Sequence, residues 1–209
     1  MLLWKTSRTE TLVQIIKDEF KDYIKAFLEE NSKLNLISKN DEKYLWEKHI
    51  FDSLAITKVF EEYGIPKTLL DIGTGGGFPS VPIAVRYPEI EVFALDSIRK
   101  KINAIENLKI ALNLNNLHTL CERAENLSQK FDTITSRAVA PLKVISGYAA
   151  PLLNNNGYFI AYKSRKADEE IQEAKTALKT GKLEIIDIIK YELPLEEVHE
   201  RNLIVLKKN

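Results

Sequence analysis

The chain has 209 residues, and its 30 Lys and Arg balance 30 Asp and Glu, so the formal net charge at pH 7 is zero. This length suits one domain with a full core and a modest extension. Zero net charge excludes a general affinity for nucleic acid, so any such partner must be held by local basic patches. The single cysteine, Cys121, excludes an intramolecular disulfide and a cysteine zinc cluster, and it fits a reducing cytoplasm.

Membrane and metal partners are not expected. No apolar run approaches the length of a membrane span, and the start of the chain (1–5) is too short for a signal peptide. The three histidines, His49, His118 and His199, have no company at metal-ligand spacing. We therefore expect a cytoplasmic protein without a metal site.

Two amphipathic helices are predicted before the first strand. The first covers about 10–31, where apolar residues recur at helical spacing. A polar loop (31–41) leads to the second, which carries Leu45, Trp46, His49, Ile50, Leu54 and Ile56. We assign 1–62 to an N-terminal helical cap that packs on the remainder, 63–209. His49 is either a packing histidine or a group near the mouth of the ligand site.

Beyond the cap, strand-like and helical runs alternate. Strands are expected at 68–72, 91–96, 117–121, 131–136 and 157–163, and helices at 79–87, 98–113, 142–153 and 167–178. This alternation predicts an α/β fold whose parallel sheet is covered on both faces. Two final strand-like runs, 183–192 and 201–207, have no helix between them, so an antiparallel edge should close the sheet. That ending is typical of the methyltransferase version of the Rossmann-like fold.

A glycine loop is the strongest single motif. The apolar run 69–72 contains Asp71 and leads into four glycines within positions 73–77. A dinucleotide fingerprint would have its third glycine where this chain has Phe78, and Asp71 would repel a pyrophosphate. The acid favours a ligand with a cationic head, such as S-adenosylmethionine, and we take Asp71, Gly73, Gly75 and Phe78 as cofactor-binding candidates. A turn that merely packs a helix on a sheet would need fewer glycines and no acid.

Further cofactor contacts are predicted after the next two strands. Asp96 ends the second strand at the distance where an acid binds ribose hydroxyls. The simpler alternative is that Asp96, or equally Ser97, caps the following helix. Ala124 and Glu125 follow the third strand, where methyltransferases commonly present an acid or amide to the adenine amino group. A solvated helix start is the alternative there.

The fourth and fifth strands should meet the acceptor. Arg137 follows the fourth strand and can clamp a phosphate or donate to guanine O6 and N7, unless it forms only a surface salt bridge. There is no Asn-Pro-Pro-Tyr motif and no cysteine at this point, which disfavours an exocyclic amino acceptor and covalent attack on a pyrimidine. Lys163, Arg165 and Lys166 form a basic cluster that could follow an RNA backbone, or simply a solvated helix start.

Several segments together resemble the bacterial small-subunit ribosomal RNA guanine-N7 methyltransferases, the glucose-inhibited division protein B family. They are the Asn-Leu-Ile-Ser segment at 35–38, the segment 46–54 with His-x-x-Asp-Ser, the glycine loop with Phe78, Leu-Asp-Ser at 95–97, Arg-Ala-Glu at 123–125 and Ser-Arg-Ala-Val-Ala at 136–140. The resemblance implies a methyltransferase fold with a helical cap and S-adenosylmethionine contacts at Gly73, Phe78, Ala124, Glu125 and Arg137. It also implies one guanine of 16S ribosomal RNA as substrate, in naked RNA or in the small subunit. We expect the enzyme to be a monomer.

The expected chemistry needs no general base. Guanine N7 carries a free lone pair, so the enzyme must mainly align N7, the methyl carbon and sulfur. Methylation makes the base cationic, so Arg137 is better suited to orient O6 or a phosphate than to stabilise the new charge. Two other functions remain open: a non-catalytic RNA-binding module, which an intact glycine loop disfavours, and a methyltransferase for a small molecule or protein, which should have a closed apolar acceptor pocket.

Overall fold

The computed structural model describes the backbone of residues 7–209 and the side chains from Val13 onward. The segment that is too short for a signal peptide (1–5) lies outside the described residues. Within the described part of the chain, no helix is both long enough and apolar enough to cross a membrane.

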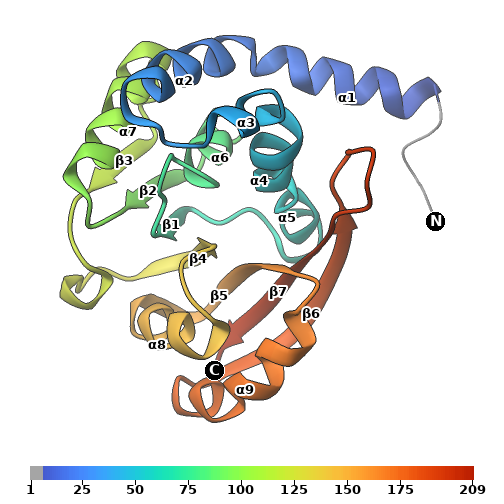
Figure 1. The fold of residues 1–209 in the computed structure, drawn as a ribbon. Coiled ribbons are helices and arrows are strands. Elements are labelled where there is room, and N and C mark those ends of the chain that lie inside the picture. The colour runs from blue at the N-terminus through green and yellow to red at the C-terminus, as the bar shows by residue number, and fades with distance from the viewer. Residues whose placement is uncertain (1–6) are drawn as a thin grey trace.

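One seven-stranded sheet organises the molecule, in the order β3-β2-β1-β4-β5-β7-β6 (Figure 1). The strands are β1 Thr68–Ile72, β2 Glu91–Leu95, β3 Leu117–Leu120, β4 Phe131–Arg137, β5 Leu153–Ser164, β6 Leu183–Glu192 and β7 Glu200–Lys208. Strands β1 to β5 are parallel, whereas β7 runs antiparallel between β5 and the edge strand β6. The predicted α/β fold class, with a mostly parallel sheet and an antiparallel pair at one edge, is confirmed.

Helices cover both faces of this sheet (Figure 1). Helices α6 (Ser80–Arg86) and α7 (Arg99–Leu112) share one face with the N-terminal elements, and α8 (Leu142–Leu152) and α9 (Ala167–Thr180) cover the other. Successive strand residues alternate between the two hydrophobic clusters, so that Leu69 belongs to the first and Leu70 to the second. Burial on both faces explains why β1 reads as a continuous apolar run rather than as an alternating one.

The first predicted helix is wrong in its continuity. It consists of α1 (Ser7–Glu19) and α2 (Lys21–Leu34), which meet at Phe20. The Phe20 amide donates to the Lys17 carbonyl at 3.2 Å, which makes a tighter turn than an α-helix has. The Phe20 ring is fully buried, 5.9 Å from the ring of Trp46. Both helices bury an apolar stripe, so the hydrophobic spacing continues across the break and hides it.

The second predicted helix is also divided. After the single turn α3 (Lys39–Glu42), the chain forms a π-helix, η1 (Leu45–Phe51), then α4 (Asp52–Leu54) and α5 (Thr57–Tyr63). A π-helix has more residues in each turn, which changes the direction of the side chains that follow, and it often marks a functional site. The proposed boundary at residue 62 falls inside α5, and buried cap residues share one cluster with a face of the sheet. The division into 1–62 and 63–209 stays a proposal.

Candidate active site

The order of the strands gathers the candidate residues at one edge of the sheet. Strands β1 and β4 are neighbours, and the connections run in opposite directions on the two sides of that pair. Ligands of such sheets bind at this switch point, beyond the carboxyl ends of the strands. The residues predicted to bind or act there lie within, or just after, the ends of strands β1 to β5: Asp71, Gly73, Gly75, Phe78, Asp96, Ala124, Glu125, Arg137, Lys163, Arg165 and Lys166.

The glycine loop presents bare backbone. Gly73, Gly75 and Gly77 have φ angles of 73°, 61° and 91°, a left-handed conformation that side chains disfavour. The Gly73 and Thr74 amides donate to the Leu95 carbonyl at 2.8 and 2.9 Å, which attaches the loop to β2. A Cβ added at Gly75 would meet only the Gly73 carbonyl oxygen, at 3.9 Å. The space over Gly75 is therefore open to a ligand.

Asp96 holds this loop in place. One carboxylate oxygen accepts from the Gly75 amide at 3.0 Å and the other from the Ile98 amide at 2.9 Å. Helix α7 has Ile98 as its N-cap, without a side-chain cap, so the alternative that Asp96 or Ser97 caps this helix is wrong. Each carboxylate oxygen keeps acceptor capacity beyond its one amide partner. The arrangement suits the predicted contact with ribose hydroxyls.

Asp71 lies beneath the loop, not at its surface. Its side chain is fully buried, and Oδ1 accepts from the Thr135 hydroxyl at 3.0 Å. Burial raises the pKa of Asp71 to about 6, although the Thr74 and Thr135 hydroxyls and the charge of Arg137 lower it in part. Oδ2 is buried without a partner in good hydrogen-bonding geometry. Asp71 can therefore act on a ligand through its charge across the loop but not by direct contact.

His49 combines the two roles that the sequence left open. Its ring packs on Phe78, with centroids 4.9 Å apart, and it lines a cavity next to Arg137. Burial, and then the positive charge of Arg137, lower the pKa of His49 to about 4. The imidazole is therefore neutral near pH 7. The Arg137 guanidinium lies 5.2 Å from the centre of the Phe78 ring, within reach of a cation–π interaction.

Arg137 is tied to a buried carboxylate. Its Nη1 donates to Asp52 Oδ2 at 2.7 Å and to the Lys48 carbonyl at 3.4 Å, and Nη2 lies 3.4 Å from Nδ1 of His49. Asp52 is only 4 % exposed, so the alternative of a surface salt bridge is wrong. Asp52 had no predicted role, although it belongs to the His-x-x-Asp-Ser motif. Its position three residues after His49, within one amphipathic segment, was the available signal.

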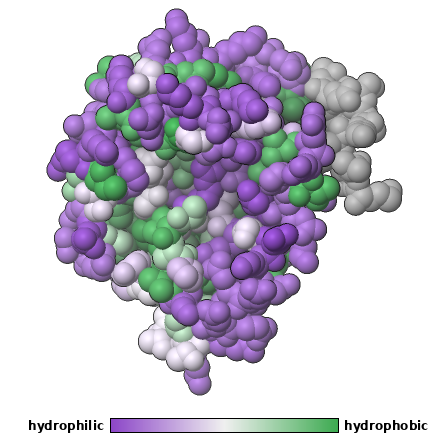
Figure 2. Space-filling view, in the orientation of Figure 1, coloured by the Kyte–Doolittle hydropathy of each residue, from purple (hydrophilic) through white to green (hydrophobic). Residues whose placement is uncertain are grey.

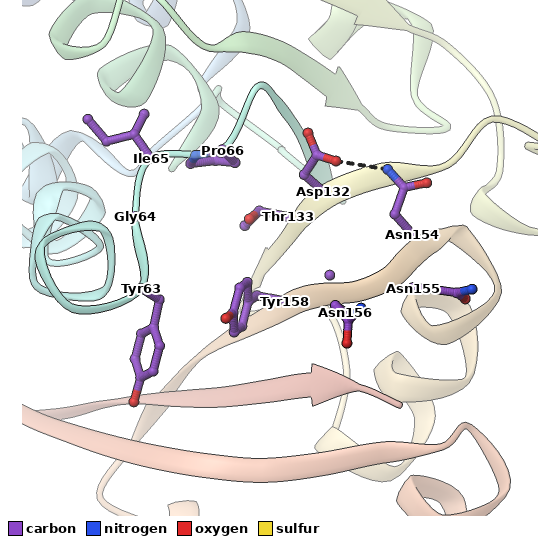
Figure 3. Close-up of a pocket in the computed structure, with 11 residues that line it drawn as sticks. Tyr63, Gly64, Ile65, Pro66, Asp132, Thr133, Asn154, Asn155, Asn156 and Tyr158 are labelled. Atoms are coloured by element: carbon purple, nitrogen blue, oxygen red, sulfur yellow. Dashed lines mark hydrogen bonds between the residues drawn. The ribbon is translucent and has the colours of Figure 1, made fainter.

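A cavity of about 520 Å³ lies beside Arg137. Its wall carries several charged side chains, among them Lys48, Asp52, Arg137, Lys163, Glu170 and Arg201. A second cavity, of about 230 Å³, lies elsewhere, between the loop after α5 and the start of β5 (Figure 3). In that view Asp132 is already bonded to Asn154, at 2.9 Å, and no predicted site residue lines the space. The cavity beside Arg137 is thus the candidate acceptor site.

The predicted basic cluster does not act as one unit. The Lys163 side chain is 9 % exposed, and its ammonium group binds Glu170 at 2.7 Å and the Ala140 carbonyl at 2.8 Å. Arg165 and Lys166 are exposed in the turn before α9. Of the three, Arg165 and Lys166 are the ones available to a phosphate, because Glu170 neutralises Lys163. Figure 2 shows a largely hydrophilic surface in this view, with hydrophobic residues in small patches.

The predicted adenine contacts lie at the end of β3. Ala124 begins the short 3-10 helix η2 (Ala124–Asn126) and is buried, whereas Glu125 is exposed. The exposed carboxylate beside a buried alanine agrees with a polar contact to a ligand edge, and the assignment of Ala124 and Glu125 to the cofactor stays a proposal.

Comparison with known proteins identifies the family. The family model for rRNA small subunit methyltransferase G matches residues 16–201. Ribosomal RNA small subunit methyltransferase G of Bacillus licheniformis is 39 % identical over 199 residues, which cover 91 % of this chain and 82 % of the relative.

Two solved structures share the fold. The YcgJ protein of Bacillus subtilis superposes with a TM-score of 0.61 at 15 % identity, over 76 % of this chain and 99 % of that one. TYW2 of M. jannaschii, solved in complex with AdoMet, gives a TM-score of 0.55 at 16 % identity, over 68 % of this chain and 69 % of that one. The matches confirm the resemblance, the methyltransferase fold, the rRNA methyltransferase activity and its cofactor, S-adenosylmethionine. The chain belongs to the rRNA small subunit methyltransferase G family.

Proposed function

We propose that this enzyme transfers a methyl group from S-adenosylmethionine to N7 of one guanine in 16S ribosomal RNA, as a cytoplasmic monomer. One observation carries the proposal: the open glycine loop and the charged cavity beside Arg137 lie at the same edge of the sheet. A cofactor on the loop and a base in the cavity would thus be neighbours. Holding two reactants together can lower the barrier by about 7–11 kcal/mol when they are well aligned.

The residues around the loop fit the cofactor. Gly75 leaves the backbone open, Asp96 has acceptor capacity for ribose hydroxyls, and Glu125 is exposed where the adenine amino group is expected. Asp71 adds negative charge below the loop, which favours a cationic ligand. When bound, the cofactor supplies an electrophilic methyl group.

The acceptor side needs orientation more than proton transfer. Guanine N7 has a free lone pair and loses no proton, and the neutral His49 next to the cavity is consistent with a site that contains no strong base. The Arg137 guanidinium, held at one end by Asp52, can donate to guanine O6 or to a phosphate oxygen. In this role Arg137 orients the base and leaves N7 free to react.

RNA is the substrate class that the cavity favours. A small-molecule or protein methyltransferase was expected to have a closed apolar acceptor pocket, whereas this cavity has Lys48, Arg137 and Arg201 on its wall. The exposed Arg165 and Lys166 extend the positive charge along the same side of the sheet. A non-catalytic RNA-binding module would not need an open cofactor loop next to that cavity.

The test uses the purified protein with methyl-labelled S-adenosylmethionine and three substrates: naked 16S ribosomal RNA, isolated small subunits, and large-subunit ribosomal RNA as a control. Digestion to nucleosides should place the label in 7-methylguanosine from one of the first two substrates. Label in another nucleoside, or equal label in the control RNA, would contradict the proposal.

A further inference from the structure

Asp52 is a buried carboxylate at which four parts of the fold meet. It begins α4, directly after the π-helix, and Arg137 of β4 donates to its Oδ2 at 2.7 Å. The Tyr191 hydroxyl, from β6, donates to its Oδ1, also at 2.7 Å. Nε of Arg201, from β7, lies 4.0 Å from the same oxygen. The other carboxylate on the cavity wall, that of Glu170, pairs instead with Lys163.

We propose that Asp52 is a positioning residue that fixes the guanidinium of Arg137 for methyl transfer. The inference rests on the proposed function, because it assigns to Arg137 the role of orienting the acceptor. A buried carboxylate is costly unless it is paired and hydrogen-bonded. Here each oxygen of Asp52 has a short bond, so the pair is held in one geometry rather than sharing solvent with alternatives.

The geometry leaves one side of the arginine free. Nη1 is occupied by Asp52 and the Lys48 carbonyl, and one Nη2–H lies toward His49. Among the described residues, neither the Nε–H nor the second Nη2–H has an acceptor. The guanidinium is planar and rigid, so fixing Nη1 also fixes the direction of these donors. The bond to Asp52 is charge-assisted and short, whereas the other two contacts are 3.4 Å long, so Asp52 provides most of the restraint.

The test is a double-mutant cycle with Asp52→Asn and Arg137→Ala. Asparagine keeps the shape and can accept from Arg137 while its amide donates to the Tyr191 oxygen, so the fold is retained and only the charge is removed. Single-turnover methyl transfer should fall by about 10- to 100-fold in Asp52→Asn, the scale expected for a misplaced catalytic group. In the Arg137→Ala background the same change should cost less than about 2-fold, because a residue that acts through Arg137 has nothing left to position.

Two further variants separate positioning from structural support. Glu30→Gln removes another buried carboxylate, which bonds Lys33 and Asn107 on α2 and α7, and it should leave the rate within about 2-fold of wild type. Tyr191→Phe removes the bond to Oδ1 but keeps the charge, and it should cost less than about 3-fold. A loss in either variant equal to that in Asp52→Asn would overturn the inference.

A spectroscopic measurement makes the result independent of turnover. In the free protein, the nitrogen resonances of Arg137 should show a guanidinium with restricted rotation, and Asp52→Asn should release it. Equal losses of rate from Asp52→Asn in both backgrounds, or unchanged resonances, would overturn the inference. If wild type fails to methylate ribosomal RNA while the resonances respond as expected, the proposed function fails and the Asp52–Arg137 restraint stands.

Discussion

Replacement of Asp71 by asparagine should make the protein more stable at neutral pH. The carboxyl is fully buried beneath the glycine loop, and burial raises its pKa from the usual 3.8 to about 6. The native protein therefore binds this proton more tightly than the unfolded chain does. Its stabilising effect is complete below the unfolded pKa and is lost as the pH rises through about 6.

The size of the effect follows from the two pKa values. The gap between 3.8 and about 6 corresponds to about 3 kcal/mol at pH values above both. The new asparagine would keep an acceptor for the Thr135 hydroxyl, but its amide group would meet the Ser80 amide that now helps to lower the pKa. We therefore expect Asp71→Asn to gain about 1–3 kcal/mol at neutral pH, with the gain vanishing in acid.

Urea unfolding of both proteins across the range from acid to neutral pH measures this difference. Asp132→Asn is the matched control: burial alone would raise the pKa of Asp132, but hydrogen bonds from Asn154 and Thr68 together lower it. That variant should lose stability at neutral pH, and the loss should shrink in acid. If Asp71→Asn is no more stable than wild type at neutral pH, or differs from it by the same amount at every pH, the reasoning is wrong.

The site supports four other predictions. Gly75→Val should abolish binding of S-adenosylmethionine in calorimetry, since valine fills the open space and resists a φ of 61°; unchanged affinity would refute the loop assignment. The single-turnover rate should stay nearly flat from neutral to mildly basic pH, whereas a steep rise would indicate an acceptor that must be deprotonated. Joint replacement of Arg165 and Lys166 by alanine should lower the salt slope of RNA binding by roughly 0.7–0.9 for each phosphate that is no longer neutralised, whereas Lys163→Ala should lower thermal stability instead; the reverse pattern would be incompatible with the ion pair to Glu170. Because the pKa of His49 falls from 6.5 to about 4, its neutral form adds stability that is lost as the pH drops through that range, and His49→Phe should flatten the dependence of the melting temperature on pH there.

The sheet could be predicted from sequence because its signals are local. The strand predicted at 183–192 has these bounds in the structure, and the glycine loop lies at the switch point. The break at Phe20 and the π-helix could not be predicted, because a hydrophobic stripe continues through both.

Interactions between distant residues were the other limit. Asp52 and Arg137 are 85 residues apart, so nothing in either local pattern reveals the bond that joins them. Lys163 is read as a solvated cation until the fold brings Glu170 of α9 against it. Local patterns thus predicted which edge holds the site, whereas the pairing of its charges required the structure.

The most direct test of the proposed function compares ribosomal RNA from cells that contain this protein with RNA from cells that lack it. Mapping of 7-methylguanosine along the 16S molecule should reveal one modified guanine in the first sample and none at that position in the second. Expression of the intact protein should restore the modification, and expression of Arg137→Ala should not. An identical 7-methylguanosine pattern in both samples would contradict the assignment of this enzyme to guanine N7.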